Sequence, residues 1–309
     1  MLPSGDSDQA NSQVDVAVVV VTYNSSEHLP EFFDSLPGAL HPLTSYEVVV
    51  VDNASHDGSA TVAGQLWPEA TVIQMGGNLG YAAGVNAGVA MSSSSQAVLV
   101  LNPDVRLGRG SVPTLLHALS PETGIAVPRL MNDRGRLIYS LRREPAVLRV
   151  LGEALLGGDR AGRFRALGEV VAIDSIYEAP VHADWASGAA MLISRECMDR
   201  VGPWDESFFL YAEEAEFALR ARDAGFLLLY VPAAEAVHIG GEVHRSAELW
   251  TLNTLNRWRL FSRRNGRLRS RAFWLSLVVN EGLRAAMGRG PHRAALRALL
   301  RSGINPPAG

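Results

Sequence analysis

The chain has 309 residues and a mass of 33.3 kDa, with 47% apolar residues, 19% charged residues and a formal net charge of −4. This composition excludes a disordered or collagen-like chain and allows one large domain or two of ordinary size. All 28 basic residues are arginines, which excludes lysine-based chemistry such as a Schiff base. The single cysteine, Cys197, excludes an intramolecular disulfide and a multi-cysteine metal site.

Residues 1–13 are polar, and we expect them to form a disordered leader. They lack the apolar segment of a secretion signal, and no window of 18 apolar residues predicts a membrane-spanning helix. We therefore expect a cytoplasmic protein.

Strands and helices alternate through the first third of the chain. Apolar runs rich in valine predict buried strands over 14–21 and 46–51, and a helical spacing covers 27–36 between them. Further predicted elements are a helix ending near 67, a strand over 71–75, a small-residue helix over 80–91 and a strand over 97–101. This order favours an α/β fold with a parallel sheet covered by helices on both faces.

Polar residues follow the predicted strands, where ligands of such sheets bind. They are Thr22-Tyr23-Asn24, Asp52-Asn53, Asn78 and 102–104. The turn after the first strand contains no glycine, so the glycine-rich dinucleotide fingerprint is absent.

The later segments are less regular. Residues 105–180 suggest a mobile insertion more than a second core. Beyond them we predict a strand over 184–193, an amphipathic helix over 212–224 and a last strand over 226–231.

Taken singly, the polar motifs leave alternatives open. Asp52 suits a base or ribose contact but also an ordinary turn. Asp104 suits Mg²⁺ or Mn²⁺, and His238 suits Mn²⁺, yet taken alone an Asn-Pro-Asp segment is more often a simple turn and a single histidine is usually structural. Glu213, Glu214 and Glu216 crowd one helix start, which fits either a general base or a solvated acidic first turn.

Seven segments in order resemble the family 2 inverting glycosyltransferases of GT-A fold, especially the bacterial rhamnosyltransferase type. They are VVVVTYNSSEHL (18–29), VVVVDNASHDGS (48–59), GGNLGYAAGVNAG (76–88), VLNPDV (100–105), DWASGAAMLISRE (184–196), VGPWDESFFLYAEEAEFALRARDAGF (201–226) and YVPAAEAVHIGG (230–241). The resemblance implies a Rossmann-like, mostly parallel sheet in a catalytic domain over 14–241. Within it, 14–104 would bind the nucleotide-sugar, and 105–241 would carry the acceptor and catalytic half.

The resemblance also implies roles for individual residues. A nucleotide-diphospho-sugar, with dTDP-rhamnose as the first choice, would lie against Thr22, Tyr23, Asn24, Asp52, Asn53, Asn78, Gly80 and Asn102. Asp104, at the end of the family's Asp-x-Asp motif, would bind Mg²⁺ or Mn²⁺ with His238. Glu214 would be the catalytic base, and Trp185, Ser187, Gly188 and Glu213 would shape a site for a glycan, lipid-linked or small-molecule acceptor.

Three positions depart from the family pattern. Asn102 replaces the first acidic residue of the metal motif, and Glu214 stands where aspartate is commoner in the family. Glu216 replaces another acidic residue of the family pattern. These departures keep open a catalytically weak, nucleotide-sugar-binding pseudoenzyme.

The C-terminal extension, residues 242–309, is expected to be helical and rich in arginine. Residues 241–309 hold 13 arginines against 3 acidic residues, whereas 1–240 hold 15 against 29. Arginines alternate with apolar residues over 257–301, which is typical of helices at anionic membrane surfaces. A membrane partner, a membrane-associated module and docking of this extension on the chain's own acidic body all remain open. Nucleic acid is not expected, because no binding module accompanies the charge.

Overall fold

A nine-stranded mixed sheet organises the chain. The computed structural model describes residues 14–92, 95–240 and 246–303. The strand order is β3-β2-β1-β4-β10-β6-β11-β5, with β8 added beside β11. The first four strands in this order run parallel, β10 is antiparallel to β4 and β6, and β11 runs parallel to β6.

The elements of the sheet and its covering helices agree closely with the alternation in the sequence. The strands are β1 (Val14–Thr22), β2 (Tyr46–Asp52), β3 (Thr71–Gln74), β4 (Ser95–Leu101), β5 (Val105–Leu107), β6 (Thr123–Met131), β8 (Val181–Ala183), β10 (Ala190–Ser194) and β11 (Leu227–His238). The helices are α1 (Leu29–Leu40), α2 (Ser59–Leu66), α3 (Tyr81–Met91), α4 (Ser111–Ala118), α7 (Arg195–Val201) and α8 (Glu213–Asp223).

Side chains of the central strands alternate between two apolar cores, one on each face of the sheet. Val18 and Val20 of β1 pack with Phe32 of α1, whereas Val19 and Val21 pack on the opposite face with Phe217 of α8. The valine runs are therefore buried on both sides, as expected for a sheet covered by helices on both faces.

The small residues of α3 are explained by its close approach to the sheet. A Cβ atom on Gly84 would lie 2.6 Å from Val21, and one on Gly88 would lie 2.4 Å from Val19. This contact fixes the start of α3, and with it Gly80 and Tyr81, against the ends of β1 and β2.

Residues 141–186 form an ordered layer, so the expectation of a mobile insertion was wrong. Its elements are β7 (Leu141–Arg142), α5 (Val147–Leu156), α6 (Gly158–Gly162), a 3₁₀ helix over Asp174–Glu178 and β9 (Trp185–Ala186). β7 pairs with β9, and the buried Tyr177 hydroxyl donates to the Val171 carbonyl and accepts from the Leu141 amide. These contacts hold a segment whose sequence has no regular periodicity.

Two strand predictions also needed correction. The predicted strand over 184–193 is two strands, because Ser187 and Gly188 interrupt it between β9 and β10. The last strand is longer than predicted and continues to His238, with a register shift between Val231 and Glu235.

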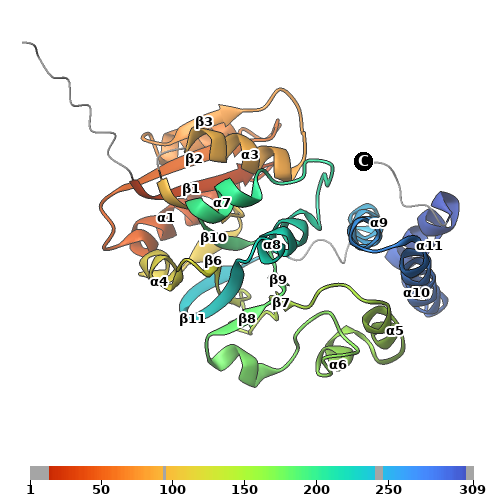
Figure 1. Cartoon of the computed structure of the whole chain (residues 1–309). Helices are drawn as coiled ribbons and strands as arrows, with labels where there is room; N and C mark the ends of the chain where they lie inside the picture. The colour runs from red at the N-terminus through yellow and green to blue at the C-terminus, as the bar shows by residue number, and fades with distance from the viewer. Residues whose placement is uncertain (1–13, 93–94, 241–245, 304–309) are drawn as a thin grey trace, which may run out of the picture.

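The C-terminal extension forms three helices, which Figure 1 shows gathered to one side of the sheet. They are α9 (Ala247–Arg264), α10 (Arg267–Ala286) and α11 (Gly290–Ser302). Trp258, Phe273 and Leu299, one from each helix, share an apolar cluster with Val150 of α5. None of the helices in the described ranges is long and apolar enough to cross a membrane.

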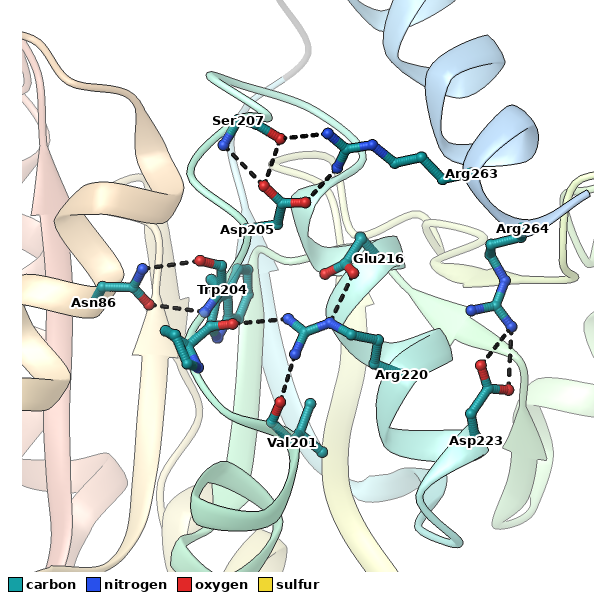
Figure 2. Close-up of polar contacts among 11 residues, drawn as sticks. Asn86, Val201, Trp204, Asp205, Ser207, Glu216, Arg220, Asp223, Arg263 and Arg264 are labelled. Atoms are coloured by element: carbon teal, nitrogen blue, oxygen red, sulfur yellow. Dashed lines mark hydrogen bonds and ion pairs between the residues drawn. The ribbon is translucent and has the colours of Figure 1, made fainter. Parts of the chain in front are cut away.

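Arginines of α9 pair with acidic residues of the preceding layers. Arg257 bonds Glu153 and Glu169 at 3.3 and 2.6 Å. Figure 2 shows Arg263 with Asp205, and Arg264 with Asp223 at 2.8 Å. The interpretation in which the extension docks on the chain's own acidic body therefore holds for α9.

Candidate active site

The loops after β1, β2 and β3 are linked by side-chain hydrogen bonds. Thr22 Oγ1 donates to Asp52 Oδ1 at 2.9 Å, and the Ser55 amide donates to Asp52 Oδ2 at 3.0 Å. Asn24, in the left-handed conformation with φ 51°, accepts from the His56 amide through Oδ1. Tyr23, in contrast, is about half exposed, with a relative accessibility of 48%.

The loop after β3 is held by Asn53. Its Nδ2 atom donates to Asn78 Oδ1 at 2.9 Å and to the Gly80 carbonyl at 3.0 Å, while its Oδ1 accepts from the Leu79 amide. Gly80 has φ +93°, and a Cβ there would lie 2.5 Å from the Phe209 carbonyl oxygen. The predicted donor-binding residues of these three loops thus form one connected framework.

Asp104 and His238 meet at the end of the sheet. They follow β4 and end β11, respectively, and β5 pairs with β11 so that Val105 lies opposite His238. His238 Nε2 lies 3.3 Å from Asp104 Oδ2. Burial raises the pKa of Asp104, but the hydrogen bond and charge of His238 outweigh burial and leave this pKa below its usual value.

A glycine keeps space beside this pair. A Cβ on Gly240 would lie 2.6 Å from Asp104 Oδ2 and 2.7 Å from His238 Nε2. A carboxylate oxygen and an imidazole nitrogen side by side fit Mn²⁺ or Mg²⁺, and the ion's other coordination positions would be left to ligand oxygens or water. The structure holds no set of three or more His, Cys, Asp or Glu side chains suited to a metal within its described residues. Asn102 lies just before this pair, and its amide donates to the Ala189 carbonyl at 2.9 Å.

The acidic start of α8 is enclosed. Glu213 is buried, Glu214 is half-buried, and the Oε2 atom of each is inaccessible and has no hydrogen-bond partner in the described structure. Burial raises the pKa of Glu214 and raises that of Glu213 well above its usual value, with the charge of Glu214 adding to the latter shift. The solvated first turn, one of the two interpretations of this cluster, is therefore wrong for Glu213 and Glu214.

Tyr81 links the acidic helix start to the Asp104–His238 pair. Its hydroxyl is buried without a hydrogen-bond partner in the described structure. The pKa of Tyr81 is raised well above its usual value, first by burial and then by the nearby charges of Glu213, Glu214 and Asp104. The proposed base and the proposed metal ligand therefore act on one tyrosine, which the sequence did not single out although it follows Gly80 directly.

The residues expected at the acceptor lie beside Glu214. A Cβ on Gly188 would lie 3.1 Å from Glu214 Cβ, so the glycine allows the chain to pass close to the glutamate. The Ser187 amide donates to the Ser140 carbonyl, and Trp185 Nε1 donates to the Arg143 carbonyl. These bonds fix the strand β9, and Trp185 packs against the apolar cluster that includes Ala212 and Ala215 at the acidic helix start.

Arg142 is a second residue that the sequence did not indicate. Its guanidinium lies 5.9 Å from the centroid of the Trp185 ring, and its charge lowers the pKa of Glu214, against the larger effect of burial. The segment SLRREP showed basic residues before a proline, but no regular pattern pointed to their position.

Comparisons with known proteins agree with this architecture. The family model described as "Glycosyl transferase family 2" matches residues 17–168. An N-acetylglucosaminyl-diphospho-decaprenol L-rhamnosyltransferase of Mycobacterium tuberculosis is 34% identical over 235 residues, covering 72% of this chain and 75% of the relative. Rhamnosyltransferase WbbL of Escherichia coli is 29% identical over 179 residues, covering 54% of this chain and 64% of WbbL.

Solved structures share the fold at low sequence identity. The mannosyltransferase PcManGT from Pyrobaculum calidifontis, in complex with GDP-Man and Mn²⁺, has a TM-score of 0.57 at 16% identity, covering 94% of this chain and 76% of that one. Residues 1–349 of TarS from S. aureus give a TM-score of 0.52 at 15% identity, covering 93% and 90% of the two chains.

Proposed function

The chain belongs to glycosyl transferase family 2 and is a glycosyltransferase, and on this premise we propose that it transfers rhamnose from dTDP-rhamnose to a hydroxyl of a lipid-linked diphospho-sugar. Two relatives named as rhamnosyltransferases support the choice of sugar, and the name of one includes a diphospho-decaprenol acceptor. The observation that carries the proposal is the pairing of Asp104 with His238 where β5 meets β11, together with the enclosed Glu214 carboxylate beside Gly188.

The donor nucleotide is placed at the loops after β1 to β4. Asp52 is buried and accepts one hydrogen bond on each oxygen, so its carboxylate keeps capacity for N–H or O–H donors of a base or ribose. Four further residues mainly hold the hydrogen-bonded framework of these loops: Thr22, Asn53, Asn78 and Gly80. Tyr23 is the exposed ring that lies free to cover a ligand, while Asn24 and Asn102 fix the neighbouring backbone.

Asp104 and His238 are the residues that would hold the divalent cation. Their adjacent oxygen and nitrogen ligands, with Gly240 leaving space beside them, fit Mg²⁺ or Mn²⁺. When bound, the ion supplies positive charge that stabilises the departing nucleoside diphosphate.

Glu214 is assigned as the general base. Its carboxylate takes the proton of the acceptor hydroxyl while that oxygen forms a bond to the anomeric carbon. The bond from this carbon to the donor diphosphate breaks, and its electron pair leaves with the diphosphate oxygen. A single displacement of this kind inverts the anomeric configuration. Burial raises the pKa of Glu214 and makes its carboxylate a stronger base than one in water.

The acceptor sugar is placed between Glu214 and the strand β9. The half-buried Trp185 ring lies beside Arg142, Gly188 lets the chain pass close to Glu214, and Ser187 connects the two. Glu213 lies beside the base, and burial and the charge of Glu214 raise its pKa well above the usual value, which favours its protonated form.

An anionic membrane surface is the partner proposed for α10. Its exposed apolar residues recur at helical spacing along one face, Leu268, Leu275, Val279 and Leu283, and the exposed Met287 follows directly after the helix. Arg267, Arg269 and Arg271 are also exposed near the start of the helix. Exposed apolar and basic groups on one helix are typical of helices in a membrane interface, which would place the enzyme beside a lipid-linked acceptor.

Transfer to a defined acceptor tests the proposed function. The full chain is incubated with Mn²⁺, dTDP-rhamnose and a lipid-linked diphospho-N-acetylglucosamine, and release of dTDP and the mass of the product are measured. We expect dTDP release that depends on the acceptor and a product heavier by one rhamnosyl unit. Binding of dTDP-rhamnose without transfer to a broad acceptor panel would instead favour the pseudoenzyme.

A further inference from the structure

A cavity of about 540 Å³ lies between the 141–186 layer, α8 and the start of β11. Six arginines line it, all but the last from residues 142–165: Arg142, Arg143, Arg149, Arg163, Arg165 and Arg222. The same cavity has an apolar wall that includes Val171, Ile173, Ile176 and Leu228. None of these arginines was given a role by the sequence.

Most of this positive charge is not neutralised by the protein. Arg222 bonds Glu144 and Asp184 at 2.7 and 3.2 Å. Among the described residues, the other five arginines have no carboxylate within ion-pair distance. Arg143 and Arg149 donate to main-chain carbonyls, including those of Gly168 and Glu144, which position their side chains but carry no net charge.

The arginines lie close enough to repel one another. Burial lowers the pKa of Arg143, and the charges of Arg149 and Arg165 lower it further. Holding like charges around a partly enclosed space is unfavourable unless an anion offsets them. Arginine is the residue best suited to bind phosphate oxygens, because its planar guanidinium donates two parallel hydrogen bonds.

Arg142 belongs to both the cavity and the candidate active site. This residue lines the cavity, and its guanidinium lies beside the Trp185 ring, next to Glu214. The apolar wall would suit a ligand that carries a hydrocarbon chain as well as an anionic group.

We propose that this arginine-lined cavity binds the diphosphate of the lipid-linked acceptor. The inference rests on the proposed function and adds the residues that recognise the acceptor's diphosphate. Arg163 and Arg165 are the two arginines best placed to be tested, since both side chains are exposed and neither donates a hydrogen bond within the described structure. Their replacement therefore removes charge from the cavity without removing an internal contact.

Binding measurements on the full chain in EDTA test the inference without turnover. The probes are inorganic pyrophosphate, farnesyl diphosphate and dTDP, which separate the bare anion, a lipid diphosphate and the donor's leaving group. The variant is Arg163→Gln/Arg165→Gln. The matched control is Arg134→Gln/Arg136→Gln, which has the same spacing and exposure outside the cavity.

We expect the wild type to bind farnesyl diphosphate more tightly than pyrophosphate, because the apolar wall adds to the arginines. The cavity variant should weaken farnesyl diphosphate binding by about tenfold or more, as expected when at least one of the two replaced arginines makes a charged contact with the diphosphate. The affinity of the cavity variant for dTDP should stay unchanged. The control variant should bind both farnesyl diphosphate and dTDP as the wild type does. Unchanged farnesyl diphosphate binding in the cavity variant would overturn the inference, and an equal loss for dTDP would assign the cavity to the donor instead.

Transfer to the lipid-linked acceptor separates this inference from the proposed function. If the wild type transfers rhamnose and the cavity variant does so with an unchanged KM for the acceptor, the inference fails while the proposed function stands. The wild type could instead show no transfer, while farnesyl diphosphate binding is still lost in the cavity variant and kept in the control. In that case the proposed function fails and the binding site stands.

Discussion

Asn256 of α9 donates from Nδ2 to the main-chain carbonyl of Tyr211 at 3.1 Å and also to that of Leu210 at 3.0 Å. Tyr211 and Ala212 both have left-handed backbones, with φ 69° and 75°, and Glu213 begins α8 directly after them. Such a backbone costs non-glycine residues energy and persists when its surroundings hold it. The C-terminal extension thus supports the turn that presents Glu213 and Glu214.

Replacing Asn256 should therefore reduce the rate of catalysis, although this residue lies outside the proposed active site. We expect Asn256→Ala to lower kcat several-fold with little change in the KM for the donor, and to cost about 1–3 kcal/mol of stability through two unsatisfied carbonyls. Asn256→Asp, which lacks the N–H donors, should behave alike. Asn253→Ala, on the same helix, is the control and should match the wild type. Steady-state kinetics and thermal unfolding measure both effects, and a wild-type kcat in Asn256→Ala would refute the coupling.

The two glutamates that begin α8 give a pH-dependent prediction for stability. Burial raises the pKa of Glu213 above its ordinary value of 4.5, so the folded state holds its proton more tightly than the unfolded state. The stability that the Glu213 carboxyl contributes to the folded state is fully present below pH 4.5, and it is lost as the pH rises through the raised pKa. Glu213→Gln should therefore raise the Tm at pH 7 by roughly 2–4 °C for each kcal/mol gained. The increase should shrink towards pH 4, which calorimetry across this range would reveal. A Tm increase independent of pH would contradict the origin in ionisation.

Gly240 offers a test of the proposed cation site that leaves both ligands in place. Gly240→Ala would bring a Cβ within 2.6 Å of Asp104 Oδ2 and 2.7 Å of His238 Nε2, so one of the two side chains must move. We expect the Mn²⁺ concentration for half-maximal activity to rise about tenfold or more. Gly38→Ala in α1, where a Cβ meets no atom within 4 Å, is the control. A Mn²⁺ titration with wild-type dependence in Gly240→Ala would remove Asp104 and His238 as a joint site.

The contact between the extension and the 141–186 layer should contribute strongly to stability. Arg257 lies between Glu153 and Glu169, and all three side chains are largely buried. Arg257→Met leaves two carboxylates unpaired, which should cost about 3–5 kcal/mol in denaturant unfolding. Breaking the exposed Arg200–Glu196 pair with Glu196→Gln should cost under about 1 kcal/mol. Equal losses in the two variants would show that burial of the pair is not the cause.

The sequence predicted the parts of the fold that regular patterns encode. The valine runs gave β1 and β2 within a residue of their ends, because strands buried on both faces need continuous apolar side chains. The pairing of Asp104 with His238 followed from the family resemblance, since no local pattern relates residues so far apart. Both lie where a strand ends at the same edge of the sheet.

Other parts were beyond such patterns for physical reasons. β7 and β9 have two residues each, too few for any periodicity, and their pairing depends on the Tyr177 hydroxyl and on distant packing. Asn256 binds main-chain carbonyls, whose position carries no side-chain signal in the sequence. Arg142 belongs to this group too, because its role arises only when β7 meets Trp185.

The assignment of Glu214 as the general base predicts that Glu214→Gln transfers rhamnose much more slowly than the wild type. Transfer of rhamnose to the lipid-linked acceptor is measured with saturating Mn²⁺ and dTDP-rhamnose, and dTDP affinity is measured in parallel to confirm an intact donor site. We expect the rate to fall at least about 100-fold, as is usual when a general base is lost, with dTDP affinity unchanged and an inverted linkage in the wild-type product. Transfer by Glu214→Gln at the wild-type rate would show that Glu214 is not the general base.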